Sequence, residues 1–436
     1  MLLCGLLLTL GAICLIFPSL GVPYLWEDEA ETAVLARNLL SHGFPTPWDG
    51  EHLVTQQAGR DFIKIGDQLV WTWHPWLQHY VCAASFALFG EGTKQARLPF
   101  ALIGLASVPL FYAWRLRRQP AGAAAITTLL YVTSLTFLLF TRQCRYYPLL
   151  FLAGVLVWWH YETLVWGAPD KQKGRWWKLG LALALLFYSN SLSAVGLVAG
   201  LLVHSLLIRR ASPAAWHQTL KACALFFVLA LPWICLMVIS EVGIADFSLG
   251  ERWLLLVALL WGFQYSMLPA ALWPVQVWMF FRWRGRFNPE AVLARREMGL
   301  LTVVASSTIL IVLAVGPVAS MRYLLALWPL CAAVLGALWA QLNYVRPWIG
   351  ATLIGLLLLS NWLQALPVMP LALAGYARVE EKPLVNLEEL AEPDSFLVEY
   401  IEDLLDVNPP QPLREAIRTQ MLRSEERRVG KECRSR

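Results

Sequence analysis

The chain has 436 residues, of which 58% are apolar and only 15% are charged, and its mean hydropathy is +0.54. Soluble proteins carry about 45–50% apolar and 25% charged residues, so this composition argues against a soluble enzyme, a disordered protein and a coiled coil. The net charge is +5, and the basic residues lie mostly in short clusters between apolar runs. Such clusters are typical of membrane topology signals, so we expect no nucleic-acid partner.

Long apolar runs follow one another along the chain, and a helix of roughly 20 residues crosses the core of a bilayer. The first run lacks the basic start and the small-residue cleavage site of a secretory signal, so we expect it to stay as the first span. The sequence predicts an all-α polytopic membrane protein with about 11 transmembrane helices. These are expected over residues 1–25, 98–114, 121–140, 148–166, 179–188, 192–208, 222–240, 253–281, 298–315, 323–340 and 348–363. The fifth and sixth are short and are separated by Ser189-Asn190-Ser191, so one bent hairpin is an alternative.

Basic residues gather in every second loop between the predicted spans, and this alternation predicts the topology. The short loops in between, which lie on the opposite side of the membrane, hold only Arg142, Arg145, Arg252 and Arg322. By the positive-inside rule the basic side is cytoplasmic, and residues 26–97 and the C-terminal region face outward. The apolar run 76–90 would invert every later loop if it were a span, so we expect an amphipathic helix at the outer interface.

An outward loop of about 70 residues is uncommonly long, and such loops are usually functional or disordered. We therefore expect a transmembrane domain over residues 1–364, with an outer catalytic loop at 26–97 that contains interfacial helices. A small outer C-terminal region follows at 365–423. The basic stretch 424–436 is interpreted as a non-native or truncated tail.

An acidic cluster, Trp26-Glu27-Asp28-Glu29-Ala30-Glu31, opens this outer loop and precedes a helix-forming stretch. Carboxylates are favoured in the first turn of a helix, so helix-end acids are one interpretation. The other is catalytic, because neighbouring carboxylates repel one another, which raises at least one pKa and suits a general base. At the boundary of water and lipid, such a base would meet both a lipid-borne and a soluble substrate.

Aromatic and basic residues supply candidate binding groups. The segment 71–80 is rich in aromatic residues that are either interface anchors or a platform for a sugar or an isoprenoid, and its His74 could donate to a phosphate. Outer arginines at Thr141-Arg142-Gln143-Cys144-Arg145-Tyr146 and at Arg322 fit an anion such as phosphate, or lipid headgroups. No HExxH-type spacing occurs, so we assign no metal ligands. The spans hold almost no ionisable residues away from their ends, which argues against an ion-coupled transporter.

Three elements occur in order: Asp28-Glu29, His74-Pro75 and Ala96-Arg97-Leu98-Pro99. In this order the sequence resembles the GT-C superfamily of membrane glycosyltransferases, in the branch of protein O-mannosyltransferases and lipid A aminoarabinose transferases. The resemblance covers the first 150 or so residues. Two positions depart from the family pattern, since Trp76 replaces a second proline and Tyr147 stands where many relatives have an acidic residue.

The resemblance implies an inverting glycosyltransferase that moves a hexosyl or pentosyl group from a polyprenyl-phosphate donor to a hydroxyl of a lipid, glycan or protein. Asp28 would be the base and Glu29 its neighbour. The donor would be held by some of His74, Arg97, Arg142, Arg145, Tyr146 and Arg322. No cofactor is assigned, and a requirement for a divalent metal is left open. The expected location is a bacterial cytoplasmic membrane, with the site facing outward. The alternatives are a flippase of lipid-linked sugars, without transfer chemistry, and a non-catalytic membrane scaffold.

Overall fold

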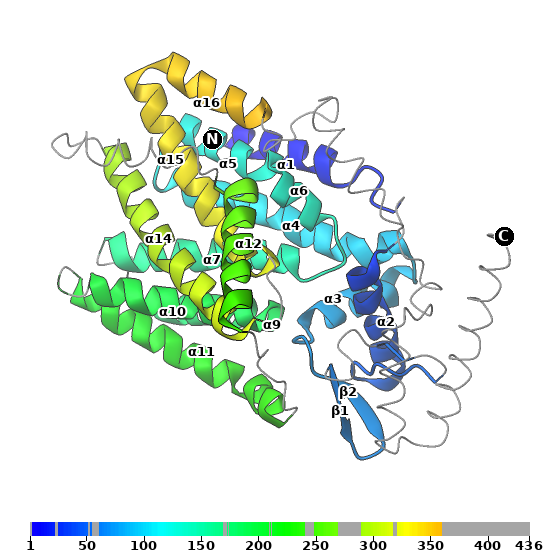
Figure 1. Ribbon diagram of the computed structural model, residues 1–436. Coiled ribbons are helices and arrows are strands. Elements are labelled where there is room, and N and C mark those ends of the chain that lie inside the picture. Colours follow the sequence, from blue (N-terminus) through cyan, green and yellow to red (C-terminus); the bar gives the residue numbers. More distant parts are fainter. Residues whose placement is uncertain are drawn as a thin grey trace. The chain divides into compact units, whose positions relative to one another are not determined.

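The computed structural model describes residues 2–21, 25–50, 53–54, 61–168, 172, 174–208, 210, 212–239, 248–268, 289–316 and 321–359. These residues are almost entirely helical (Figure 1). The chain divides into two compact units, which we describe separately. The helical unit comprises Met1–Pro18, Phe100–Leu231 and Ile244–Glu381, and the loop unit comprises Ser19–Pro99, Pro232–Gly243 and Lys382–Arg436. The predicted regions 365–423 and 424–436 lie outside the described residues.

The loop unit contains two helices that pack against each other, α2 (Glu27–His42) and α3 (Leu77–Phe89). Helix α2 begins where the Trp26 N–H donates to the Glu29 carboxylate at 3.4 Å, and it ends at Gly43, whose φ of 82° is left-handed. The helices predicted after the acidic cluster and over 76–90 are therefore both present as helices. Helix α4 (Thr93–Leu116) begins in this unit and continues into the helical unit.

Along the chain, a β-hairpin separates these two helices, and it was not predicted from the sequence. Strands β1 (Phe62–Ile65) and β2 (Gln68–Trp71) pair antiparallel, from Phe62 opposite Trp71 to Ile65 opposite Gln68. The two-residue turn is Gly66-Asp67, and Gly66 has a φ of 62°, which glycine adopts without steric cost. Two short strand-like runs around a glycine turn were the available signal.

The helical unit is built from helices in sequence order. They are α1 (Leu2–Ile16), α4, α5 (Ala121–Thr133), α6 (Leu135–Thr141), α7 (Tyr147–Trp166), α9 (Arg175–Ser189), α10 (Ser191–Leu207), α11 (Pro213–Ile239), α12 (Leu249–Ser266), α14 (Pro289–Val315), the 3₁₀ helix η2 (Met321–Leu327), α15 (Trp328–Val345) and α16 (Pro347–Leu359). Five described stretches are long and apolar enough to cross a membrane, and shorter apolar helices accompany them. The predicted all-α polytopic membrane fold is confirmed, and the chain is an integral membrane protein.

Two predicted spans are interrupted. The run 121–140 forms α5 and α6, because Ser134 adopts an extended backbone and its hydroxyl caps α6 by accepting from the Phe137 N–H at 3.1 Å. The run 323–340 begins as the 3₁₀ helix η2 and becomes α-helical at Trp328, which Pro329 follows in the first turn. Of the predicted span 253–281, the part after residue 268 lies outside the described residues.

Helices α9 and α10 are two separate helices that meet at Asn190. The Asn190 backbone is extended, and its side chain accepts from the Ser193 N–H at 2.9 Å, so it caps α10. The Ser193 hydroxyl donates to the Tyr323 carbonyl at 2.9 Å, whereas His204 near the other end contacts the Tyr161 hydroxyl at 2.8 Å. Helix α10 therefore runs from η2 to the last turns of α7.

Candidate active site

The acidic cluster lies in the first turns of α2 and is buried. Asp28 is only 8% exposed, and Glu29 and Glu31 are fully buried. The Thr32 hydroxyl donates to the Asp28 carbonyl at 3.1 Å within the helix. A helix N-terminus favours negative charge, but full burial of a carboxylate also requires partners. The cluster is therefore more than a solvated helix end.

Glu29 has such a partner in Arg97. The Arg97 guanidinium donates from Nε to Oε1 at 2.8 Å and from Nη2 to Oε2 at 2.6 Å, and its Nη1 donates to the Leu20 carbonyl at 3.1 Å. This is the two-pronged geometry that makes arginine–carboxylate pairs strong. Arg97 is only 6% exposed, so each of its three nitrogens is engaged inside the loop unit. The sequence analysis placed Arg97 among the phosphate-binding groups and had no signal for this pair.

His74 lies between β2 and α3 in the aromatic segment of the loop unit. Its ring is half-buried and meets the Trp73 ring edge-on, with centroids 6.1 Å apart. Trp76 donates from Nε1 to the Trp71 carbonyl at 2.8 Å, and its ring meets Trp233 of α11 edge-on at 5.9 Å. Trp76 is thus fixed by packing, and Trp233 is a member of the aromatic group that sequence spacing did not reveal.

In the helical unit, arginines that were predicted to face outward contact tyrosines. Arg145 is 2% exposed, and its guanidinium carbon lies 5.9 Å from the centre of the Tyr146 ring. The Tyr146 and Tyr147 rings meet edge-on at 4.7 Å, and Arg322 donates from Nη1 to the Tyr147 hydroxyl at 3.1 Å. The structure therefore brings Arg322 to the start of α7, beside two of the residues with which it was predicted to act.

The two remaining arginines that were predicted to face outward contact backbone carbonyls. Arg142 is half-buried and donates from Nη2 to the Pro18 carbonyl at 2.8 Å. Arg252 donates to the carbonyls of Leu313 and Ala314 at the end of α14. A cation there satisfies the last carbonyls of the helix and complements its dipole. Arg252 thus has a structural role.

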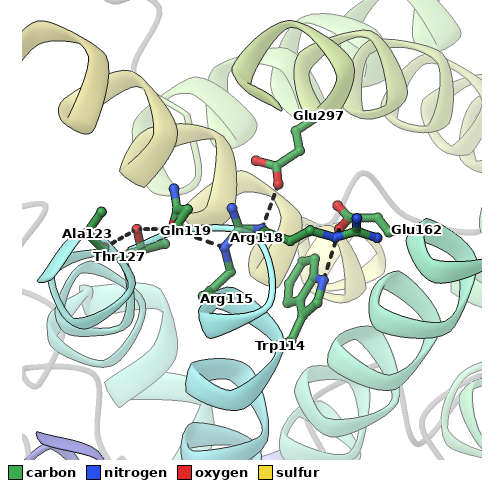
Figure 2. Close-up of polar contacts among 8 residues, drawn as sticks. All are labelled: Trp114, Arg115, Arg118, Gln119, Ala123, Thr127, Glu162 and Glu297. Carbon is green, nitrogen blue, oxygen red and sulfur yellow. Dashed lines mark hydrogen bonds and ion pairs between the residues drawn. The ribbon is translucent and has the colours of Figure 1, made fainter. Parts of the chain in front are cut away.

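A buried ionic network that the sequence analysis did not predict occupies the other end of the helical unit (Figure 2). Glu162 accepts from the Trp114 Nε1–H at 3.0 Å and pairs with Arg118 at 3.3 Å, and Arg115 pairs with Glu297 at 2.6 Å. These contacts hold together the last turns of α4 and α7 and the first turns of α14. The loop charges predict the same alternation, since they place these three helix ends on one side.

Among the described residues, no group of three or more His, Cys, Asp or Glu side chains is arranged to hold a metal ion.

Comparisons with known proteins fit this arrangement. A family model described as dolichyl-phosphate-mannose-protein mannosyltransferase matches residues 73–236, a segment that includes His74, Arg97, Arg142, Arg145 and Tyr146. The crystal structure of ArnT from Cupriavidus metallidurans bound to undecaprenyl phosphate has a TM-score of 0.56 and 20% sequence identity, and the match covers 81% of this chain and 63% of that one. Its apo form gives the same TM-score and identity, with 62% of that chain covered.

An oligosaccharyltransferase from Archaeoglobus fulgidus, in complex with zinc and sulfate, has a TM-score of 0.44 and 14% identity over 87% of this chain and 55% of that one. No curated protein matches the chain. The chain thus spans less than two thirds of the length of each of these structures.

The family match over residues 73–236 and the likeness of the fold to ArnT agree with the resemblance to GT-C membrane glycosyltransferases that the three ordered motifs predicted. The fold is similar to that of ArnT.

Proposed function

We propose that this protein is an inverting glycosyltransferase that moves a sugar from a polyprenyl-phosphate donor to a hydroxyl acceptor on the outer face of the membrane. Two comparisons support the donor class: the matching family is named for a dolichyl-phosphate-linked sugar, and the similar ArnT structure is bound to undecaprenyl phosphate. The observation that carries the catalytic assignment is the Glu29–Arg97 pair, because it assigns different roles to the neighbouring carboxylates Asp28 and Glu29.

Glu29 and Arg97 act as positioning residues in this proposal. Both carboxylate oxygens of Glu29 are occupied by guanidinium donors and the residue is fully buried, so neither oxygen is placed to meet an acceptor hydroxyl. The pair instead fixes the first turn of α2, which carries Asp28. A base on a rigid, supported turn keeps its geometry without reorganisation during the reaction.

Asp28 is then the general base. It takes the proton from the acceptor hydroxyl while that oxygen attacks the anomeric carbon, and the bond from this carbon to the phosphate oxygen breaks on the opposite side. One displacement inverts the anomeric configuration. The polyprenyl phosphate leaves as an anion, so positive groups near its phosphate stabilise the transition state.

The candidate groups for the donor phosphate are Arg145 and Arg322 in the helical unit, with Tyr146 beside them, and His74 in the loop unit. Arg145 lies against the Tyr146 ring, and Arg322 donates to the Tyr147 hydroxyl, so both guanidinium groups are oriented before a donor binds. Arginine suits this task because its planar donors match phosphate oxygens. Arg142 is a weaker candidate, since it already donates to the Pro18 carbonyl.

The proposed location is a bacterial cytoplasmic membrane with the site on its outer side. The acceptor is a hydroxyl of a lipid, a glycan or a protein of the cell envelope.

The test is transfer of radiolabelled sugar from a polyprenyl-phosphate donor, measured in membranes with equal amounts of wild-type protein and Asp28→Asn. Loss of a general base should lower the rate by about 10²–10⁴-fold while donor binding is kept. Asp67→Asn is the matched control, because it makes the same chemical change at an exposed hairpin turn of the same unit. Equal transfer by wild type and Asp28→Asn would refute the assignment. Movement of donor across the bilayer without transfer, in both proteins, would favour a flippase.

A further inference from the structure

Three cations at one end of the helical unit each lie against a tryptophan. Arg117 has its guanidinium carbon 4.7 Å from the centre of the Trp159 ring, and Arg296 lies 5.9 Å from Trp166. The third is the Lys178 ammonium, 5.2 Å from the ring of its neighbour Trp177. A cation over an indole face is attracted by the negative ring face, so each charge is held in place.

Arg117 and Arg296 gather around the end of α7, and Lys178 lies on α9, which packs against α7. Trp159, Glu162 and Trp166 are spaced by three and four residues, so they share one face of that helix. The Arg118–Glu162 pair brings the end of α4 to this face, and the Arg115–Glu297 pair brings the start of α14 to the same place. These two ion pairs also bring Arg117 and Arg296 to this place, because each of them is adjacent in sequence to a paired residue.

The local acids are already used by other residues. Glu162 and Glu297 are fully buried, and they pair with Arg118 and Arg115 (Figure 2). Within the part of the chain that the structure describes, Arg117 and Arg296 form no ion pair, and both side chains are exposed. Among the described residues, Arg117 and Arg296 therefore leave positive charge at this end that is held by indoles and not by carboxylates.

Apolar side chains continue from this charge along the outside of α9. Trp177 is 44% exposed, and Leu181, one turn further, is 47% exposed. Lys178 lies at the start of the same apolar stripe. An anion on Lys178 that carried acyl chains would therefore extend them over Trp177 and Leu181, as a phospholipid at the edge of a membrane does. Tryptophan is favoured at the same depth.

We propose that this surface, formed by Arg117, Lys178 and Arg296 with Trp159, Trp166 and Trp177, binds the phosphate of an anionic phospholipid headgroup. The positive-inside topology assigns it to the cytoplasmic leaflet. It is separate from the proposed donor groups of the helical unit, because Arg322 and Tyr147 lie at the opposite end of α7. The proposal does not depend on the transfer activity.

The test uses full-length protein in detergent, whose thermal unfolding is followed while phosphatidylglycerol or phosphatidylcholine is added. The double variant Arg117→Gln/Arg296→Gln should bind phosphatidylglycerol about 20-fold more weakly than wild type, because each cation beside the bound headgroup contributes roughly five-fold to binding of an anionic lipid. The control Lys221→Gln/Arg346→Gln removes the same charge from exposed residues that contact no indole among the described side chains, and it should lose less than about three-fold.

Several outcomes decide between the sources of the anion. Equal losses in the two double variants would overturn the proposal in favour of diffuse surface charge. Equal stabilisation of wild type by both lipids would also overturn it, because the surface would then show no preference for an anionic headgroup. Stabilisation by inorganic phosphate as strong as by phosphatidylglycerol would assign the surface to a free anion instead. Arg117→Lys/Arg296→Lys keeps the charge and should retain most of the binding. If it loses binding while folded, charge on the indoles is not what binds the lipid.

Discussion

Arg97 donates to both carboxylate oxygens of Glu29, at 2.8 and 2.6 Å, although the two residues are 68 positions apart. The pair joins the first turn of α2 to the second turn of α4, and both side chains are buried. A carboxylate motif that looks uniform in sequence therefore contains one residue committed to structure. This separation of roles is why Asp28, and not Glu29, is the proposed base.

Removal of either partner should destabilise the protein strongly. Glu29→Gln leaves a buried guanidinium without its counter-charge, and loss of one partner from a buried pair costs about 3–5 kcal/mol in the free energy of unfolding. Thermal or denaturant unfolding in detergent measures this. The control is Arg37→Gln, which breaks a pair with Asp49 whose arginine is 40% exposed, and it should cost less than about 1 kcal/mol. Similar costs for both variants would contradict a structural role of Glu29.

The contact between Arg322 and Tyr147 makes a separate prediction about the donor. Tyr147→Phe keeps the buried ring but removes the hydroxyl that accepts from Arg322 at 3.1 Å. Loss of a hydrogen bond to a charged group costs about 1.5–3 kcal/mol, so donor binding should weaken by about ten-fold or more if Arg322 holds the phosphate. Transfer rate against donor concentration shows the change as a higher KM.

Tyr344→Phe is the control for this effect, since Tyr344 is 73% exposed on α15. An unchanged donor dependence in Tyr147→Phe, with normal folding, would remove Arg322 from the donor-binding groups.

The helices were predictable because a helix that crosses a membrane needs a long run of apolar side chains, and such runs are visible in the sequence. The break at Ser134 and the change at Trp328 were not, since they depend on a cap and on a switch of helix type inside continuously apolar sequence. The β-hairpin was missed because its strands have four residues each, too few to stand out within a loop that otherwise shows helical pattern.

The places of the candidate residues in the fold were predictable, and their hydrogen-bond and ion-pair partners were less so. The positions of Asp28 and Arg322 near the starts of helices follow from motif and topology. The partner of Arg97 does not, because an isolated arginine near an outer helix fits a phosphate as well as a carboxylate. Arg115 and Glu297 are 182 positions apart, and only the folded chain brings their side chains together.

Close packing between α10 and α14 predicts a steric effect at Gly200. A Cβ added there would lie 2.6 Å from the Cα of Val304, and a backbone atom moves only if the helix moves. Gly200→Ala should therefore lower stability by about 1–3 kcal/mol despite the better helix propensity of alanine. Gly299→Ala in α14 is the control, because nothing lies within 4 Å of the added atom, and it should be neutral or stabilising by up to about 1 kcal/mol. A neutral Gly200→Ala would contradict the close approach of the two helices.

The network at the other end of the unit should respond differently to single and double changes. Glu297→Leu alone leaves the Arg115 guanidinium buried, and we expect a loss of about 3–5 kcal/mol. Arg115→Leu/Glu297→Leu removes both charges, and apolar replacement of a complete buried pair is often neutral, so the double variant should be more stable than Glu297→Leu. A double-mutant cycle in thermal unfolding measures this coupling. Additive losses would mean that the two residues act independently and that the pair does not connect the ends of α4 and α14.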